Sequence, residues 1–317
     1  MNEEKIRELL FSRDNANQKL AWELDKHINN GLLRKKLESQ YIDLMNLLKV
    51  DIVSLVAKEA LYLFRRNLTE LPAIPPNFTK LYCQGNQLKS LPSLPHVVEL
   101  NCSNNQLNIL PSLPNVVKLD CSRNQLTTLS SLPNIVELDC SRNQLSTLPP
   151  LPKIDRLKCY RNQLIALPLL STITYLSCYK NQLSTLPPLP EVLWLYCSLN
   201  QLNTLPSLPN AVHLGCSDNM LKTLPVLPKI QKLFCENNSL SVLPNLPYVE
   251  QLDCQNNQLK SLPNLPYVEQ LYCQDNQLKS LPSLPHIMEL KCSNNQLSNL
   301  PELPKIVDLE CDDYLRK

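Results

Sequence analysis

The residues best suited to chemistry in this chain are its thirteen cysteines. They recur at intervals of 19 residues from Cys83 to Cys311. Regularly placed thiols raise the possibility of a metal or redox site. However, no C-x-x-C pair occurs and only four histidines are present, so the spacing of a zinc site is missing. Neighbouring parallel strands, about 4.7–5 Å apart, also exceed the usual disulfide Cβ separation of about 3.8 Å. We therefore interpret the cysteines as small hydrophobic core residues and expect no metal and no cofactor.

The remaining candidate catalytic residues form no recognisable constellation. His27, His96, His213 and His286 are scattered, and none has a nucleophile partner that the sequence reveals. A buried thiol is a poor nucleophile. With only three glycines, the chain also has no glycine-rich phosphate-binding loop. We expect a protein that is not an enzyme.

The strict period predicts a solenoid, in which copies of one unit stack on each other. Within a unit, Val97, Leu100 and Cys102 alternate with polar residues, which is typical of a strand with one buried face. The return segment reads LPxLP in ten of the twelve complete units. Because proline fixes φ and lacks an amide hydrogen, this segment cannot be a helix or a central strand. We expect it to be extended and similar to polyproline.

Residues 1–58 contain no proline and have a helical pattern. We expect a short first helix that includes Ile6 and Leu10. A second should run from Asp14 or Asn15 to about Asn29, and a third from about Leu33 to Lys49. The predicted domains are therefore a helical cap, residues 1–58, and a solenoid of 13–14 repeats, residues 59–317. The alternative for residues 1–58 is a separate docking or targeting segment.

The unit Val97-x-x-Leu100-x-Cys102-x-x-Asn105-x-Leu107 resembles the leucine-rich-repeat signature LxxLxLxxNxL. The resemblance implies an α/β solenoid, a horseshoe whose parallel β-sheet lines the concave side. The short unit and its LPxLP segment are similar to the bacterial subtype of the YopM and IpaH effectors. IpaH-type members also carry a catalytic ubiquitin-ligase domain after the repeats, and we expect no such domain in this chain.

An asparagine accompanies each cysteine three positions later in the regular repeats, from Asn86 to Asn295. In a tight turn, asparagine can bond to backbone groups that would otherwise be buried without a partner. The family resemblance implies the same role. We interpret these asparagines as structural.

Function is better sought where the repeat varies. The variable strand positions face away from the core, and in the middle of the stack they hold aromatic and basic residues. This composition is typical of a binding hot spot, although a tolerant solvated face is the simpler alternative. The predicted partner-binding residues are Tyr160, Tyr175, Tyr179, Trp194, Tyr196, Leu199, His213, Phe234, Arg123, Arg142, Arg161, Lys180, Arg156 and Lys158.

We predict binding of a protein or peptide on the concave face. One alternative is a translocated bacterial effector that acts on a host protein. Another is a nucleic-acid or anionic-ligand binder that uses Arg123, Arg142, Arg161 and Lys180, although the net charge of +2 argues against it. We find no secretory signal and no long apolar run, and thus expect no membrane span and a cytoplasmic protein, or one translocated without a signal peptide. The oligomeric state stays open.

Overall fold

The computed structural model describes residues 3–12 and 14–315. Residues 1, 2, 13, 316 and 317 of the predicted domain ranges therefore lie outside the described residues. The chain divides into two compact units, Met1–Ile135 and Val136–Lys317. The first unit holds the helical region and the first repeats, and the second unit holds repeats only. The division into a cap, 1–58, and a repeat domain, 59–317, stays a prediction.

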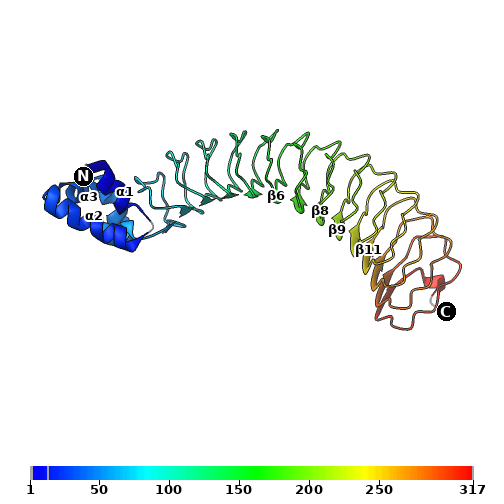
Figure 1. Ribbon diagram of the computed structural model, residues 1–317. Coiled ribbons are helices and arrows are strands. Elements are labelled where there is room, and N and C mark those ends of the chain that lie inside the picture. The colour runs from blue at the N-terminus through cyan, green and yellow to red at the C-terminus, as the bar shows by residue number, and fades with distance from the viewer. Residues whose placement is uncertain (1–2, 13, 316–317) are drawn as a thin grey trace. The chain divides into compact units, whose positions relative to one another are not determined.

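The helical region occupies the start of the first unit (Figure 1). Its helices are α1 (Glu3–Leu10), α2 (Asn15–Ile28), α3 (Leu32–Gln40), α4 (Ile42–Leu48) and α5 (Ile52–Val56). The single helix expected from Leu33 to Lys49 is wrong, because Tyr41 divides it into α3 and α4. Tyr41 leaves helical geometry, with φ −113° and ψ 18°, where its side chain enters the core at 3% exposure.

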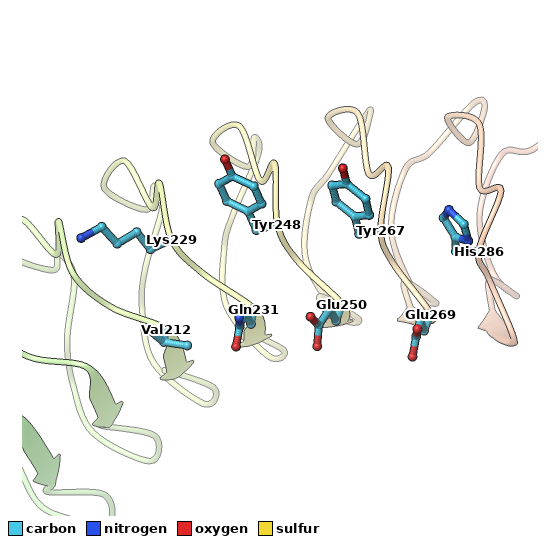
Figure 2. A pocket seen from close by; sticks show the side chains of 8 residues that line it. All are labelled: Val212, Lys229, Gln231, Tyr248, Glu250, Tyr267, Glu269 and His286. Atoms are coloured by element: carbon cyan, nitrogen blue, oxygen red, sulfur yellow. The ribbon is translucent and has the colours of Figure 1, made fainter.

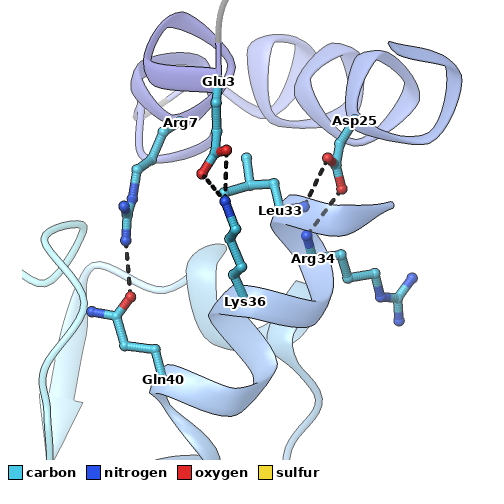
Figure 3. A network of polar contacts seen from close by, with 7 residues as sticks. All are labelled: Glu3, Arg7, Asp25, Leu33, Arg34, Lys36 and Gln40. Carbon is cyan, nitrogen blue, oxygen red and sulfur yellow. Dashed lines mark hydrogen bonds and ion pairs between the residues drawn. The ribbon is translucent and has the colours of Figure 1, made fainter. Parts of the chain in front are cut away.

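Helix α3 is capped by a residue from another helix. Its own N-cap position is Gly31, which has φ 70° and no side chain to offer. Asp25 of α2, only 1% exposed, accepts hydrogen bonds from the amides of Leu33 and Arg34, both at 3.0 Å (Figure 3). The carboxylate thus satisfies two orphan amides and places negative charge at the positive end of the helix dipole.

Polar contacts join the helical region to the first repeat. The side-chain amide of Asn77 donates to the carbonyl oxygens of Leu55 and Lys58 at 3.2 and 2.6 Å. The Arg66 guanidinium donates to the Leu47 carbonyl oxygen at 3.1 Å. These contacts are what a cap on the first repeat would need.

Strands of three residues recur once per repeat, and each pairs in parallel with the next strand of its unit. In the first unit they are β1 (Ala60–Tyr62), β2 (Lys80–Tyr82), β3 (Glu99–Asn101) and β4 (Lys118–Asp120). In the second unit they are β5 (Glu137–Asp139), β6 (Arg156–Lys158), β7 (Tyr175–Ser177), β8 (Trp194–Tyr196), β9 (His213–Gly215), β10 (Lys232–Phe234), β11 (Gln251–Asp253), β12 (Gln270–Tyr272), β13 (Glu289–Lys291) and β14 (Asp308–Glu310). Equivalent residues of successive repeats are aligned, as with Leu157 and Leu176, so each position forms a column across the sheet.

One face of each strand builds the core. In the repeat around β8, Leu195, Cys197, Leu202 and Leu208 are all fully buried. The residues on either side of the central leucine point the other way and are half-exposed. Within the second unit, the strands lie on the inner side of the curved stack (Figure 1). The predicted repeat architecture is confirmed.

The asparagine of each repeat bridges two turns. The side-chain amide of Asn200 donates to the carbonyl oxygens of Cys197 and Cys178, at 2.9 and 3.2 Å. Its oxygen accepts from the Leu183 amide of the preceding repeat at 3.0 Å. The same pattern recurs at other repeats, for example at Asn219. The structural interpretation of the asparagines is confirmed.

The proline-containing return segments of the described repeats contain neither helix nor strand, as expected. An asparagine near the start of several repeats secures this side of the stack. Asn210, for example, donates from its side chain to the Pro190 carbonyl oxygen at 3.0 Å. In the part of the chain that the structure describes, no helix has the length and apolar character needed to cross a membrane.

Candidate functional site: the aromatic surface of the second unit

The strands of the second unit bring aromatic side chains together on their outward-facing columns. Tyr160 and Tyr179 occupy the position directly after the cysteine in successive repeats. Their rings stack with centroids 4.5 Å apart and an interplanar angle of 8°. We call Tyr160, Tyr175, Tyr179, Trp194 and Tyr196 the central aromatic surface.

The other members of this surface are also in ring contact. Tyr175 and Tyr196 lie with their ring centroids 5.9 Å apart, tilted by 53°. Trp194 meets His213 edge to face, with centroids 6.4 Å apart. All four side chains are half-exposed. Contacts between rings hold these side chains in place at little entropic cost, which favours binding.

A depression of 510 Å³ opens among these rings. Its lining consists of Lys158, Tyr160, Tyr175, Ser177, Tyr179, Tyr196 and Ser198. Ser177 is 4% exposed, so a small buried residue lies between the larger side chains of Lys158 and Tyr196 in its column. The alternation of large and small residues therefore shapes a hollow able to receive one side chain.

Gly215 plays a related part for Tyr196. A Cβ atom at Gly215 would lie 3.3 Å from Cδ1 of Tyr196 and 3.6 Å from the hydroxyl oxygen of Ser198. The absence of a side chain thus allows the Tyr196 ring to lie close to the neighbouring strand. Gly215 is a functional candidate that the sequence analysis did not single out.

A row of cations occupies the turn that follows the strands. Arg142, Arg161 and Lys180 hold the second position after the cysteine, with φ of 55–57°, and Leu199 continues the row with φ 55°. Left-handed backbone is disfavoured for these residue types and favoured for glycine, asparagine and aspartate. Later repeats of the second unit hold the favoured types at the equivalent position: Asp218, Asn237, Asn256, Asp275 and Asn294.

Those later residues also bond to each other. Asn256 donates from its side chain to Asn237 at 2.6 Å, and Asn237 donates to Asp218 at 3.0 Å. Among the described residues, no side-chain hydrogen bond or ion pair engages Arg161 or Lys180. These cation positions therefore lack a residue type that favours left-handed backbone. They also lack the side-chain hydrogen bonds that join the equivalent residues of later repeats.

Two further cations lie on β6 beside the aromatic rings. The Arg156 guanidinium lies over the Tyr175 ring, 4.7 Å from its centroid. The Lys158 ammonium lies 3.9 Å from a carboxylate oxygen of Asp139. Arg156 is thus fixed by a cation–π contact, while Lys158 is partly neutralised.

Burial of the rings alters their acidity. It raises the pKa of both Tyr175 and Tyr196, so their hydroxyls stay protonated. Burial, together with the Lys232 ammonium, lowers the pKa of His213. At neutral pH the side chains of Tyr175, Tyr196 and His213 are therefore uncharged.

In the repeats that carry this surface, Cys159, Cys178 and Cys197 are buried free thiols. Burial raises the pKa of Cys178 to about 12 and that of Cys197 well above its usual value, which keeps both thiols protonated and weakly nucleophilic. Within residues 3–12 and 14–315, no group of three or more histidine, cysteine or acidic residues is arranged to hold a metal ion.

The structure brings together most of the predicted site residues, and their binding role stays a prediction. The five central aromatic residues, His213, Arg156 and Lys158 lie on β6–β9 and the turns that follow. Phe234 is half-exposed on β10, and Leu199 is 48% exposed. Arg123 belongs to the first unit, where it is exposed with φ 53°.

Two groups of exposed aromatic residues were missed. In the first unit, Tyr62 stacks on Tyr82 with centroids 5.0 Å apart, and Phe64 contacts Tyr62 edge to face. In the second unit, Tyr248 and Tyr267 are 56% and 54% exposed. The available signal for Tyr248 and Tyr267 was an aromatic residue at the position where earlier repeats hold polar residues, such as Asn115, Asn134 and Asn210.

The comparisons with known proteins agree with this architecture. The family model for "Leucine Rich repeats (2 copies)" matches residues 114–153. YopM, a leucine-rich effector protein from Yersinia pestis, is 28% identical with a TM-score of 0.60, over 92% of this chain and 97% of that chain. No curated protein sequence matches the chain.

Two further solved structures share the fold. A leucine-rich-repeat protein of Leptospira interrogans is 24% identical with a TM-score of 0.64, over 80% of this chain and 84% of that one. The functional domain of InlJ from Listeria monocytogenes, which includes a cysteine ladder, is 24% identical with a TM-score of 0.58. The match covers 77% of this chain and 64% of that chain. From its repeats, its parallel strands and these matches, the chain has a leucine-rich-repeat architecture similar to that of the bacterial effector YopM.

Proposed function

We propose that this protein is a non-enzymatic binding module and that the second unit recognises a protein or peptide through its central aromatic surface. Half-exposed tyrosine and tryptophan side chains beside arginine are typical of interface hot spots. The ring contacts of Tyr160 with Tyr179 and of Tyr175 with Tyr196 preorganise the surface. The hollow above Ser177 would receive one side chain of the partner.

The observation that carries the proposal is the cation row in left-handed backbone. Each such residue costs about 1 kcal/mol or more relative to a residue that favours this conformation. Arg161 and Lys180 directly follow Tyr160 and Tyr179 in the chain, and Arg142 holds the same position one repeat earlier, whereas Asp218 and later residues return to the favoured types. Backbone strain at cations that lie next to exposed aromatic rings supports a binding role for the cations and for the rings.

The same row indicates the chemistry of the partner. Arg161 and Lys180 are exposed cations, and no carboxylate of the described chain pairs with them. A partner that places an aspartate or glutamate over this row would form charge-assisted bonds. We therefore expect an apolar or aromatic anchor flanked by an acidic residue.

The similarity to YopM supports a more specific proposal. YopM is described as an effector protein. By analogy, this chain would be translocated from a bacterium and would bind a protein of the host cell. This role rests on a likeness of 28% identity and adds to the binding proposal without altering the surface that it uses.

A second candidate function is binding of a nucleic acid or another anionic ligand. Its support is the unpaired cation row beside the stacked pair Tyr160 and Tyr179, since bases stack on such rings. The net charge of +2 opposes it. A single-stranded oligonucleotide that binds with a steep loss of affinity on addition of salt would favour this candidate.

Affinity capture tests the binding proposal. Wild-type protein and a Trp194→Ala/Tyr196→Ala variant are used as bait, and the captured proteins are quantified by mass spectrometry. We expect a partner that is enriched by the wild type and lost with the variant, while the thermal unfolding of both baits stays similar. Equal recovery of every captured protein with both baits would refute the proposal.

A further inference from the structure

A second surface lies within the second unit, apart from the central aromatic surface. It is a groove of 740 Å³ lined by Val212, Lys229, Gln231, Tyr248, Glu250, Tyr267, Glu269 and His286. Figure 2 shows two rows: Lys229, Tyr248, Tyr267 and His286 form one, and Val212, Gln231, Glu250 and Glu269 form the other. Each row takes one residue from each of four successive repeats.

The tyrosines replace residues that bridge repeats elsewhere. At the equivalent position Asn210 donates from its side chain to the Pro190 carbonyl oxygen, and Asn115 of the first unit donates to that of Pro95 at 2.8 Å. A tyrosine side chain ends in a hydroxyl at the far side of a ring and is more than half-exposed at both positions. In these two successive repeats, an exposed aromatic ring thus stands where asparagine in other repeats donates a hydrogen bond to the preceding repeat.

The charges of the groove are separated. Glu250 and Glu269 are exposed, and within the described chain neither carboxylate forms an ion pair. The Lys229 ammonium donates to the side-chain oxygen of Asn210 at 2.8 Å, and its side chain extends away from Tyr248 (Figure 2). The groove therefore offers one row with two carboxylates that form no ion pair, next to a row with two exposed tyrosine rings (Figure 2).

Carboxylates beside tyrosine rings are complementary to a guanidinium group. Its planar face stacks on an aromatic ring, and its N–H groups reach carboxylate oxygens in a bidentate manner. A lysine ammonium has the charge but not the planar face, and is more strongly hydrated. The chemistry thus favours arginine over lysine.

We propose that this groove binds an extended peptide that presents an arginine side chain to Tyr248, Tyr267, Glu250 and Glu269. The peptide would run across successive repeats, with its guanidinium between the ring row and the carboxylate row. This site is independent of the central aromatic surface and would give the protein a second partner.

Fluorescence anisotropy with three labelled peptides tests the proposal. The first alternates glycine and arginine, and in the other two lysine or citrulline replaces arginine. Citrulline has nearly the shape of arginine without the charge. We expect the arginine peptide to bind at least about 10-fold more tightly than the citrulline peptide and several-fold more tightly than the lysine peptide.

Matched variants locate the site. Tyr248→Asn/Tyr267→Asn introduces the residue that other repeats use, so the fold should be kept. Glu250→Gln/Glu269→Gln removes two charges. Both should weaken binding of the arginine peptide at least about 10-fold. Glu191→Gln/Glu302→Gln removes two exposed charges outside the groove, and Trp194→Ala/Tyr196→Ala alters the other surface; neither should change the affinity.

Several outcomes would overturn the proposal. The first is a dissociation constant of the arginine peptide above about 1 mM. The second is equal binding of the arginine and citrulline peptides. Lysine binding as tight as arginine binding would contradict the arginine assignment. Wild-type dimerisation that Tyr248→Asn/Tyr267→Asn abolishes would make a second copy of the chain the occupant, contradicting the peptide.

Discussion

Tyr160 and Tyr179 stack face to face from equivalent positions of successive repeats, with ring centroids 4.5 Å apart. The preceding and following repeats of the second unit hold serine at this position, Ser141 and Ser198. A solenoid of identical units would present a uniform surface, because each column repeats one side chain. The aromatic pair is therefore a local departure from the repeat, and such departures show where a binding surface is to be sought.

The first prediction concerns Arg161, whose φ is 55°. Arg161→Asn should raise the free energy of unfolding by about 1 kcal/mol, because asparagine tolerates left-handed backbone better than arginine does. The same change should weaken partner binding by removing an unpaired cation. Urea unfolding and affinity measurements on the one variant test both effects.

Asn256→Arg is the matched control for Arg161. It places arginine in left-handed backbone, at φ 51°, and removes the hydrogen bond to Asn237. We expect lower stability and unchanged partner binding. If Arg161→Asn instead lowers stability, the interpretation of the cation row as strained would be wrong.

The second prediction concerns the buried thiols at alkaline pH. Burial raises the pKa of Cys178 from 9.0 to about 12, and that of Cys197 well above 9.0. The unfolded chain therefore releases thiol protons that the folded chain keeps. The contribution of these protonated thiols to the free energy of unfolding is fully present below about pH 8.5. It is lost as the pH rises through 9 toward 12, by up to about 1.4 kcal/mol per pH unit for each thiol.

Urea unfolding in reducing buffer between pH 7 and pH 10.5 measures this slope. A Cys178→Ala/Cys197→Ala variant loses some packing, but its stability should decline less steeply above pH 9 than that of the wild type. Parallel slopes for the two proteins would show that these thiols are not the source of alkaline unfolding.

The third prediction concerns Asp253, where burial, with a smaller effect of Glu236, raises the pKa from 3.8 to about 6. An acid with a raised folded pKa stabilises the fold fully below its unfolded pKa, and loses this contribution as pH rises toward 6. Asp253→Asn should thus be more stable than the wild type at pH 7 by about 1 kcal/mol, after allowance for solvent screening. The advantage should shrink toward pH 4.

Chemical unfolding at pH 4, 5.5 and 7 tests this dependence. Glu302→Gln, at an exposed position of the same unit, should show little difference from the wild type at each pH. An Asp253→Asn variant less stable than the wild type at pH 7, or with a constant difference from pH 4 to 7, would refute the assignment.

The sequence was sufficient to predict the repeats, because their period places every cysteine and asparagine in a defined environment. Cys197 and Asn200 lie in the core and the turn as predicted. The helical region was predicted less well. The break at Tyr41 depends on burial of its side chain among the helices, and neither proline nor glycine marks it in the sequence.

The residues of the candidate site were predicted from the sequence, but their backbone conformation was not. Arg142 and Arg161 were recognised as variable positions, yet their left-handed backbone became visible only in the structure. The preference for asparagine, aspartate or glycine at this position in other repeats was the available signal. Tyr248 and Tyr267 were not predicted because they lie before the strand, outside the columns beside the buried leucine and cysteine.

The most direct test of the central claim is the affinity of a purified captured partner, measured by isothermal titration calorimetry. The Trp194→Ala/Tyr196→Ala variant should bind at least about 100-fold more weakly than the wild type, as expected for loss of two hot-spot side chains. Tyr248→Asn/Tyr267→Asn, which alters the other groove, should bind like the wild type. A dissociation constant of the Trp194→Ala/Tyr196→Ala variant within about threefold of the wild-type value, with both proteins folded, would contradict the account.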